Sequence, residues 1–409
     1  MDSKPSNSYS PRLLYIYSIV LIDIIAGSIM WPVFPKFLQG TKEPALLLAL
    51  GSAIFIGIQL VTAPLLGKLS DVKGRKPIFL ISAIGTFLAN LFLIPKNPFA
   101  YFSNRTLDGI TNGVYTAVRS SITDISDKKD LMKNIGMEGS IVSLGFVIGP
   151  LVAGGILTIA NVTDPGSTTV LVCTGILVSF LNILLAIFFR ETLVSANSQI
   201  SPTDLWKDLK NSISLVKNFQ KILEHDRKNP GFKNIILLQV FLTMCLGYYS
   251  YLISFISLGK LQMSTKQISY FFIYFGAISI AINYYFFTYL VQKINPKIFL
   301  PIVSFLGILT HIGYAFSGSS IPFLYAIVTI DCFTISFLPG ILDGLFAGFT
   351  TEENRGELFG ISQVLNGIFS IVTSLIYGLL SILSLDLPFY WFALCLVPFL
   401  FSKQFLKHY

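Results

Sequence analysis

Long apolar stretches recur along this whole sequence, and they constrain its fold more than any other feature. Each is about 20 residues long, which is enough to cross a bilayer core of about 30 Å as a helix. A single stretch could be a buried helix of a soluble domain, but only 12% of the 409 residues are charged, too few to cover so many cores. The sequence predicts an all-α integral membrane protein. We place twelve transmembrane helices at 12–36, 45–67, 77–95, 98–121, 135–158, 168–189, 233–256, 267–290, 297–316, 321–347, 357–381 and 387–405.

Positive charge is distributed unevenly between the predicted loops. With the N-terminus in the cytoplasm, the extracytoplasmic segments hold only five of the 29 Lys and Arg residues: Lys36, Lys42, Lys96, Lys260 and Lys266. This asymmetry follows the positive-inside rule and predicts a multi-pass protein of the plasma (inner) membrane with both termini cytoplasmic. Because topology accounts for the net charge of +8, the lipid bilayer is an expected partner and nucleic acid is not.

A polar segment at 191–232 divides the predicted helices into two sets of six. The sequence therefore predicts an N-terminal six-helix bundle at 1–190, a cytoplasmic central loop, and a C-terminal six-helix bundle at 233–409. The stretches DKKDLMKNIG at 127–136 and TEENRGELFG at 351–360 are similar, and each enters the fifth helix of its half. Such an echo indicates two repeated bundles related by pseudo-symmetry.

Part of the central loop has helical periodicity. Its apolar positions are Leu205, Leu209, Ile213, Val216, Phe219, Ile222 and Leu223. This spacing predicts a helix on the membrane surface. A flexible linker remains the alternative.

The predicted loop between the second and third helices has the sequence GKLSDVKGRKP. Its pattern is formed by Gly67, Asp71, Gly74, Arg75 and Lys76. An ordinary positive-inside loop would explain the cations but neither the acid nor the glycines. The pattern resembles the loop signature of the major facilitator superfamily. This resemblance implies a gating role, in which Arg75 pairs with an acid at the end of the fourth helix, here Asp124.

The predicted fifth helix carries a second motif of small residues. It consists of Gly136, Gly145, Gly149, Pro150 and Gly154, with Ala153 where the related pattern has glycine. Small residues let helix backbones approach closely, and a proline removes a backbone hydrogen bond and bends the helix. General helix packing is one explanation. The spacing also resembles the fifth-helix signature of the superfamily's antiporters, which implies antiport.

The first predicted helix contains LIDIIAGSIMWPVFP, in which Asp23 precedes a glycine and a pair of prolines. This stretch resembles the first helix of the drug–proton antiporter group of the superfamily, which includes the tetracycline exporters. The stretch ENRGELFG before the eleventh helix is similar to the corresponding part of the same group. The resemblance is clear in most of the first half and faint in the second.

Charged side chains inside the predicted helices indicate structural or functional roles, because each raises the free energy of membrane insertion by about 2.5–3.5 kcal/mol at the bilayer centre. The mid-helix ones are Asp23, Arg105, Asp108 and Asp331. Arg105 and Asp108 lie one turn apart and can pair, either as a static ion pair or as one that a proton or substrate opens. The resemblance implies that the first, fourth, seventh and tenth helices line a central cavity. We predict that these four residues couple proton movement to transport, with Asp23 and Asp331 as proton carriers.

Aromatic and polar residues on the expected cavity helices are candidates for substrate binding. They are Trp31, Tyr115, Gln239, Tyr248, Tyr249 and Asn366. Such residues often simply fill a bundle. A cavity that combined them with acids would suit an amphipathic, cationic compound. The four cysteines lie in apolar stretches without CxxC spacing, so we expect no metal site and no disulfide framework.

The leading hypothesis is a proton-coupled secondary transporter that exports a small organic or drug-like compound by alternating access. The monomer is the expected functional unit, and the proton gradient supplies the energy without a bound cofactor. The alternatives are a proton-coupled transporter of a specific metabolite such as a sugar, and a transporter-like sensor without flux. No nucleophile–base pair or nucleotide-binding loop indicates an enzyme.

Overall fold

The chain forms helices throughout the part that the structure describes. This computed structural model describes residues 11–127, 130–162, 164, 166–193, 210, 214–286, 289, 295–351 and 354–406, and these contain no strand. Each of the twelve ranges predicted as transmembrane contains helix, which confirms the all-α class. Nine helical segments of the described chain are long and apolar enough to cross a membrane.

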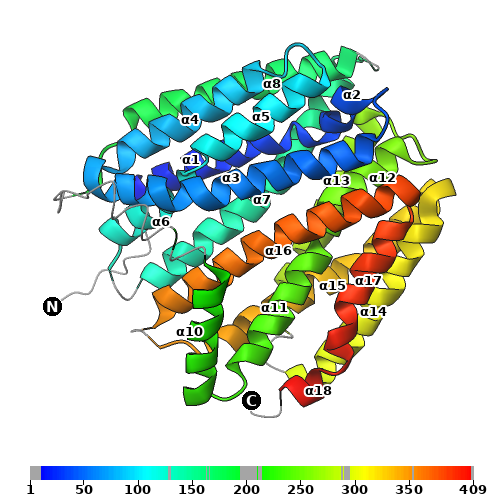
Figure 1. Cartoon of the computed structure of the whole chain (residues 1–409). Helices are drawn as coiled ribbons and strands as arrows, with labels where there is room; N and C mark the ends of the chain where they lie inside the picture. Colours follow the sequence, from blue (N-terminus) through cyan, green and yellow to red (C-terminus); the bar gives the residue numbers. More distant parts are fainter. Residues whose placement is uncertain are drawn as a thin grey trace.

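The first half of the chain forms one group of packed helices, which we call the N-terminal group (Figure 1). It contains α1 (Pro11–Ser28), α2 (Phe34–Leu38), α3 (Pro44–Lys73), α4 (Arg75–Leu91), α5 (Pro98–Thr111), α6 (Val114–Ile125), α7 (Leu131–Ile159) and α8 (Gly166–Phe188). A 3-10 turn, η1 (Trp31–Val33), joins α1 to α2.

The fourth predicted helix is not continuous. It divides into α5 and α6 because Asn112 and Gly113 leave the helical conformation. A hydroxyl of α4 stabilises this break: Ser82 Oγ donates to the carbonyl of Thr111 (2.7 Å) and accepts from the Gly113 N–H (3.1 Å). Backbone groups inside a membrane need such partners, since no water replaces them.

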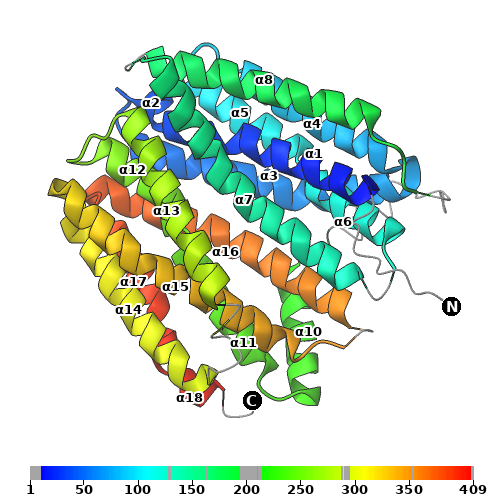
Figure 2. The ribbon, with the colours of Figure 1, turned by 180° about the vertical axis from the view of Figure 1, so that it is seen from behind.

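The second half forms the C-terminal group (Figure 2). It contains α11 (Phe232–Leu246), α12 (Tyr248–Leu258), α13 (Thr265–Tyr285), α14 (Pro296–Phe316), the turn η4 (Ser317–Ser319), α15 (Ile321–Ala347), α16 (Arg355–Leu383), α17 (Leu387–Leu400) and α18 (Ser402–Phe405). The predicted seventh helix is divided at Gly247 into α11 and α12.

The two groups contact each other mainly along α3 with α16 and α7 with α13, and α12 also packs against α3 and α2. They lie close together at the end that carries α2 and α12, and they diverge toward the end that carries α10 (Figure 1). At the diverging end, a Cβ atom placed on Gly136, Gly139, Gly344 or Gly360 would meet no neighbouring atom within 4 Å. The described contacts of Asp164 with Thr265 and of Thr158 with Tyr270 join the two groups at the converging end.

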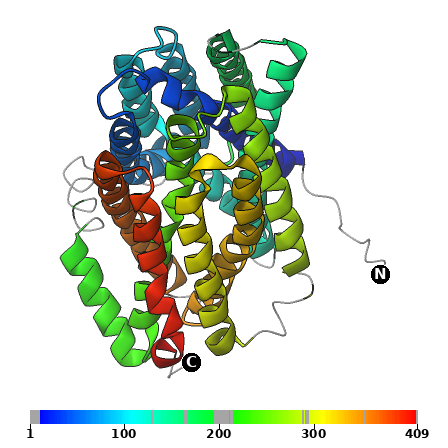
Figure 3. The same cartoon turned by 90° about the vertical axis from the view of Figure 1, so that its right-hand side faces the viewer.

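The central segment contains the helix α10 (Leu215–Lys228), which packs against α11 (Figure 3). Ile222 is buried, whereas Val216 and Phe219 are 68% and 60% exposed. Lys221 Nζ lies 2.5 Å from Glu357 Oε1 of α16. The structure confirms the predicted helix from residue 215 onward; Leu205, Leu209 and Ile213 lie outside the described residues. A place on the membrane surface remains a prediction.

Candidate functional site

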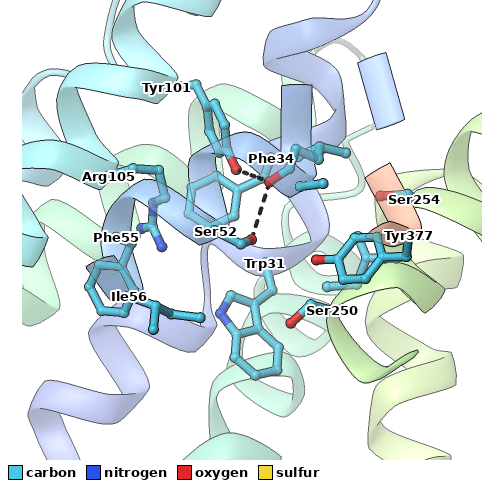
Figure 4. Close-up of a pocket in the computed structure, with 13 residues that line it drawn as sticks. Trp31, Phe34, Ser52, Phe55, Ile56, Tyr101, Arg105, Ser250, Ser254 and Tyr377 are labelled. Carbon is cyan, nitrogen blue, oxygen red and sulfur yellow. Dashed lines mark hydrogen bonds between the residues drawn. The ribbon is translucent and has the colours of Figure 1, made fainter. Parts of the chain in front are cut away.

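A cavity of about 200 Å³ lies between the two groups. The N-terminal group contributes Trp31, Phe34, Leu48, Ala49, Ser52, Phe55, Ile56, Tyr101 and Arg105, and the C-terminal group contributes Ser250, Ile253, Ser254 and Tyr377. In Figure 4, Arg105 and Phe55 lie on one side of the space, and the serines and Tyr377 on the other. A ligand in this cavity would contact both groups at once.

Arg105 is the one charged residue among the described residues that line the cavity. Its Nε and Nη2 donate to Asn104 Oδ1 at 2.9 and 2.5 Å, and Nη2 lies 3.8 Å from Asp108 Oδ2. Its Cζ lies 4.4 Å from the ring centroid of Phe34 and 5.3 Å from that of Phe55. The expected pair with Asp108 is present but long, and cation–π contact adds to what holds the guanidinium.

Asp23 lies inside the N-terminal group, between α1 and α8, and is 8% exposed. Asn182 Nδ2 of α8 donates to Asp23 Oδ1 at 3.0 Å. Asn182 Oδ1 is buried without a hydrogen-bond partner in the described structure. Asn182 was not among the predicted site residues, although a lone asparagine in an apolar helix could have indicated a buried polar contact.

Buried polar side chains extend from Arg105 toward Asp23. Asn104, which accepts from Arg105, donates through Nδ2 to Asn90 Oδ1 (3.5 Å), and Asn90 Nδ2 donates to Ser179 Oγ of α8 (3.1 Å). Ser179 lies one helical turn before Asn182, the partner of Asp23. The structure thus joins the cavity arginine to the neighbourhood of a buried acid through side chains that are polar but uncharged.

Asp331 is fully buried inside the C-terminal group. Tyr248 and Tyr314 donate to its Oδ2 at 2.5 and 3.0 Å, and Thr310 and Thr334 donate to its Oδ1 at 3.2 and 2.6 Å. A hollow of about 10 Å³, close to the size of one water molecule, lies beside it. Asp331 and Tyr248 were expected at the central cavity, but both face the interior of their own group.

The remaining predicted binding residues are divided between the cavity and the bundle interiors. Trp31 lines the cavity. Gln239 accepts from Ser362 (3.1 Å) and Asn366 accepts from Thr243 (2.9 Å), so both tie α11 to α16. Tyr249 and Tyr115 pack against hydrophobic clusters, Tyr249 by stacking on Phe275 with centroids 4.7 Å apart.

Five polar residues of the cavity were missed by sequence reasoning: Ser52, Tyr101, Tyr377, Ser250 and Ser254. Ser250 and Ser254 lie one helical turn apart in an otherwise apolar helix, a spacing that could have revealed them. The tyrosines gave no comparable signal. Their placement depends on how α5 and α16 are rotated in the assembled fold.

The loop motif forms a cluster around Arg75 at the start of α4. Its Nε and Nη2 donate to the Asp124 carboxylate at 2.9 and 3.2 Å, and Nη1 donates to Ser70 Oγ at 3.1 Å and to Asp71. The expected contact between Arg75 and Asp124 is therefore present. Every member of the cluster belongs to the N-terminal group. A Cβ on Gly67 would lie 3.5 Å from Thr116 of α6, an ordinary van der Waals contact, so the packing of α3 against α6 does not require glycine at this position.

Glu191, which follows α8, caps the start of α4. Its Oε1 accepts from the Arg75 N–H (2.9 Å) and its Oε2 from the Lys76 N–H (3.0 Å). Burial acts to raise the pKa of Glu191, but its hydrogen bonds from backbone N–H groups, Leu193, Arg75, Lys76 and Thr192, hold that pKa below its ordinary value. A carboxylate at a helix N-terminus is favoured by the free N–H groups there.

Substitution of Gly74 by Ala is expected to lower the melting temperature by a few degrees. Gly74 has φ +100° and ψ 164°, and an added Cβ would overlap the Glu191 carboxylate. Such a backbone conformation costs a non-glycine residue about 1–3 kcal/mol. Thermal unfolding of the purified protein measures the effect. Gly155→Ala is the control, because a Cβ there meets no atom within 4 Å; equal melting of the two variants would contradict the prediction.

The fifth-helix motif joins α7 to two different partners. A Cβ on Gly145 would lie 2.7 Å from Ile24 Cγ2, and one on Gly149 would overlap Ser28, so both glycines allow α1 to pack closely. Gly154 instead faces α13 of the C-terminal group, 3.3 Å from Ser269 Cβ. Pro150 lies inside the continuous helix. Gly136 faces open space, so it makes no close helix contact in this conformation.

A polar contact joins the two groups at the end where they converge. Asp164, between α7 and α8, accepts from Thr265 Oγ1 at 2.8 Å and from its N–H at 3.4 Å, and it lies 3.0 Å from Lys36 Nζ. Burial acts to raise the pKa of Asp164, but Lys36 and Thr265 bind its carboxylate and hold the pKa below 3.8. Asp164 thus ties the start of α13 to the N-terminal group.

Asp164→Asn is expected to lower the melting temperature at neutral pH. Because the folded pKa is depressed, this carboxylate stabilises the fold above its ordinary pKa, and the contribution is lost as pH falls through the folded value. The difference between wild type and variant should therefore shrink in melting curves recorded from about pH 7 to about pH 3. Asp386→Asn, at the start of α17, is the control. A difference that grows on acidification would contradict the assignment.

The comparisons with known proteins agree with this architecture. A model of the Major Facilitator Superfamily matches residues 16–374. The chain belongs to the major facilitator superfamily. It is therefore a multi-pass membrane protein of a transporter family and not an enzyme. Among the described residues, no group of three His, Cys, Asp or Glu lies close enough to hold a metal ion.

Several relatives in this superfamily are drug-resistance proteins. The chain is 31% identical over 184 residues to the class H tetracycline resistance protein of Pasteurella multocida, a match that covers 44% of each protein. It thus spans less than half of that relative's length. Multidrug resistance protein 2 of Bacillus subtilis (strain 168) is 22% identical over 94% of this chain and 92% of the relative.

Solved transporter structures share the fold over nearly the whole chain. The human organic anion transporter MFSD10 (TETRAN) is 17% identical, with a TM-score of 0.66 over 97% of this chain and 100% of that one. The POT family transporter PepTSo is 11% identical, with a TM-score of 0.71 over 98% and 99% of the two chains. At these identities the likeness shows the fold alone.

Proposed function

We propose that this protein is a proton-coupled antiporter of the plasma membrane that exports a small organic compound by alternating access. The observation that carries the proposal is the cavity between the two groups, with Arg105 connected through Asn104 and Asn90 toward the buried Asp23. A substrate site that communicates with a buried acid is what coupling requires. The drug-resistance relatives support export.

The moving parts would be the segments 1–190 and 233–409, joined by 191–232. The two groups diverge toward the end that carries α10, which we assign to the cytoplasm from the loop charges. In a state that opens the converging end, the contact of Asp164 with Thr265 would have to break, whereas its contact with Lys36 lies within the N-terminal group. Alternating access by rocking of two bundles around a fixed site explains how one cavity could serve both sides.

The proposal also assigns roles to the remaining motifs. Asp23 and Asp331 would carry protons, and the pair of Arg105 and Asp108 would respond to the occupied cavity. The cluster of Gly67, Asp71, Gly74, Arg75, Lys76 and Asp124 would hold the ends of α3, α4 and α6 rigid, so that the N-terminal group moves as one body. Gly145 and Gly149 would keep α7 closely packed on α1, and Gly154 would let α7 move against α13.

A flux experiment tests the proposal. Everted membrane vesicles from cells that express the protein are given an inside-acid pH gradient, reported by a pH-sensitive dye. The panel contains antibiotics, dyes, aromatic acids and sugars. We expect some of the antibiotics, dyes or aromatic acids to dissipate the gradient, with no response in vesicles from a strain that lacks the protein. A sugar that alone produced the response would instead favour a metabolite transporter. Absence of any response to the whole panel would favour a sensor without flux.

A further inference from the structure

The cavity between the two groups is small and is lined largely by aromatic side chains. Its volume of about 200 Å³ is below the roughly 300–1,000 Å³ typical of sites for drug-sized ligands. Trp31, Phe34, Phe55, Tyr101 and Tyr377 supply most of its large side chains. A flat compound with a single ring fits these walls, and a large multi-ring compound does not fit this conformation.

The charge of the lining is positive. Arg105 lines the cavity, whereas Asp23 contacts Asn182 and Asp331 contacts four hydroxyls, each inside its own group. Asp108 only partly balances the guanidinium, because its carboxylate lies 3.8 Å from Nη2. A ligand carboxylate could approach to about 2.8 Å, the usual length of a charge-assisted hydrogen bond.

The guanidinium has hydrogen-bonding capacity left for a ligand. Of its several N–H donors, two are used on the single oxygen of Asn104. The rings of Phe34 and Phe55 hold it in place without using a donor. A planar guanidinium with free donors is suited to a carboxylate, which it binds through two parallel hydrogen bonds.

The opposite side of the cavity offers neutral hydroxyls. Ser250 and Ser254 of α12 and Tyr377 of α16 face the space across from Arg105 (Figure 4). A hydroxyl on the far end of a ligand ring would meet them. A ligand of this shape would place its charge on the N-terminal group and its neutral end on the C-terminal group.

We propose that the cavity binds small monoaromatic compounds that carry a carboxylate, rather than the cationic compounds expected from the sequence. This inference rests on the proposed transport function and assigns a substrate class to it. A cationic ligand in the same place would lie beside the guanidinium in surroundings of low dielectric, where like charges repel strongly. Asp23 and Asp331 are hydrogen-bonded inside their own groups, and Asp108 lies beside the guanidinium but is not among the residues that line the cavity.

Three probes of similar size separate the possibilities: 4-hydroxybenzoate, 4-hydroxybenzyl alcohol and tyramine, which are an anion, a neutral compound and a cation. Binding to the purified full-length protein in lipid nanodiscs is measured by calorimetry. We expect 4-hydroxybenzoate to bind on the order of tenfold more tightly than either of the others. Arg105→Gln should remove that advantage, so that the variant binds 4-hydroxybenzoate no more tightly than 4-hydroxybenzyl alcohol.

Two further variants control the test. Arg105→Lys keeps the charge but loses the planar donor pair, and an intermediate affinity for 4-hydroxybenzoate is expected. Lys260→Gln removes one positive charge from an exposed loop and should change nothing. Tyramine binding as tightly as 4-hydroxybenzoate would overturn the inference, and so would unchanged anion binding by Arg105→Gln. The wild-type comparison decides the matter even if Arg105→Gln fails to fold.

The inference and the proposed function can fail separately. If the vesicles respond to cationic compounds and not to aromatic acids, the transport proposal stands and the substrate class is wrong. If 4-hydroxybenzoate binds through Arg105 but no compound moves protons in vesicles, the ligand class stands and the transport proposal is wrong.

Discussion

Asp23→Asn is expected to reduce proton-driven transport by on the order of tenfold or more, without a change in melting temperature. An asparagine at this position can still accept the hydrogen bond from Asn182 Nδ2, so the contact between α1 and α8 is retained. What is lost is a group that can bind and release a proton. The initial rate of gradient dissipation in everted vesicles, with a compound that the wild type exports, measures the effect.

Asp331→Asn serves as the second arm of this experiment and should reduce both transport and stability. The Asp331 carboxylate lies within hydrogen-bond distance of four hydroxyls, and an amide oxygen can still accept from Tyr248 and Tyr314. Thr310 and Thr334 would then donate only to the carbonyls of Gly307 and Asp331, so the loss is that of one or two hydrogen bonds, roughly 0.5–1.5 kcal/mol each. Tyr314→Phe is the matched control, because it removes one donor and leaves the carboxylate in place. If both acid variants transported as well as Tyr314→Phe, neither acid would be a proton carrier.

Arg75→Gln is expected to lower the melting temperature by several degrees and to slow transport far more than it weakens substrate binding. Arg75 is 5% exposed and is the common partner of Asp71, Asp124 and Ser70. The decrease in the free energy of unfolding should be smaller than the roughly 3–5 kcal/mol that is lost when one partner of a fully buried ion pair is removed. The reason is that Asp71 is 57% exposed and remains hydrated.

The effect of Arg75→Gln on substrate binding shows whether the cluster around Arg75 acts in gating or in substrate recognition. The cluster around Arg75 shares no residue with the central cavity, so the dissociation constant of a transported compound should stay within about twofold of wild type. Lys73→Gln removes the same charge from the exposed end of α3 and controls for loop charge. A parallel loss of affinity and rate in Arg75→Gln would mean that the cluster does not act as a gate.

Most of the features that were predicted correctly from the sequence depend on residues that are close together in the chain. An apolar stretch is recognised by its own length, and a loop by its own charge, so the helices could be placed before any contact was known. The contact between Arg75 and Asp124 was also expected, through resemblance to a known loop pattern, and the structure contains it. The ion pair of Arg105 and Asp108, in which Nη2 and Oδ2 are 3.8 Å apart, was predicted from helical spacing alone.

The errors arose where tertiary contacts decided the outcome. The break between α5 and α6 was not predicted, since the stretch has helical periodicity and the hydroxyl that stabilises the break belongs to Ser82, on another helix. Asp331 and Tyr248 were placed at the central cavity, yet they face each other inside the C-terminal group. A helix that lies on the correct side of a bundle can still direct a given side chain away from the cavity.

The sequence by itself determined that this chain is a bundle of transmembrane helices, which charges lie within the membrane, and which loop carries the arginine cluster. Each of those properties depends only on residues that are close together in the sequence. Only the tertiary structure decided which polar groups share a cavity, because that depends on the rotation of each helix about its axis and on the packing of the two groups. For this reason Arg105 lines the central space with aromatic rings, while the acids that had indicated a cationic ligand are hydrogen-bonded elsewhere.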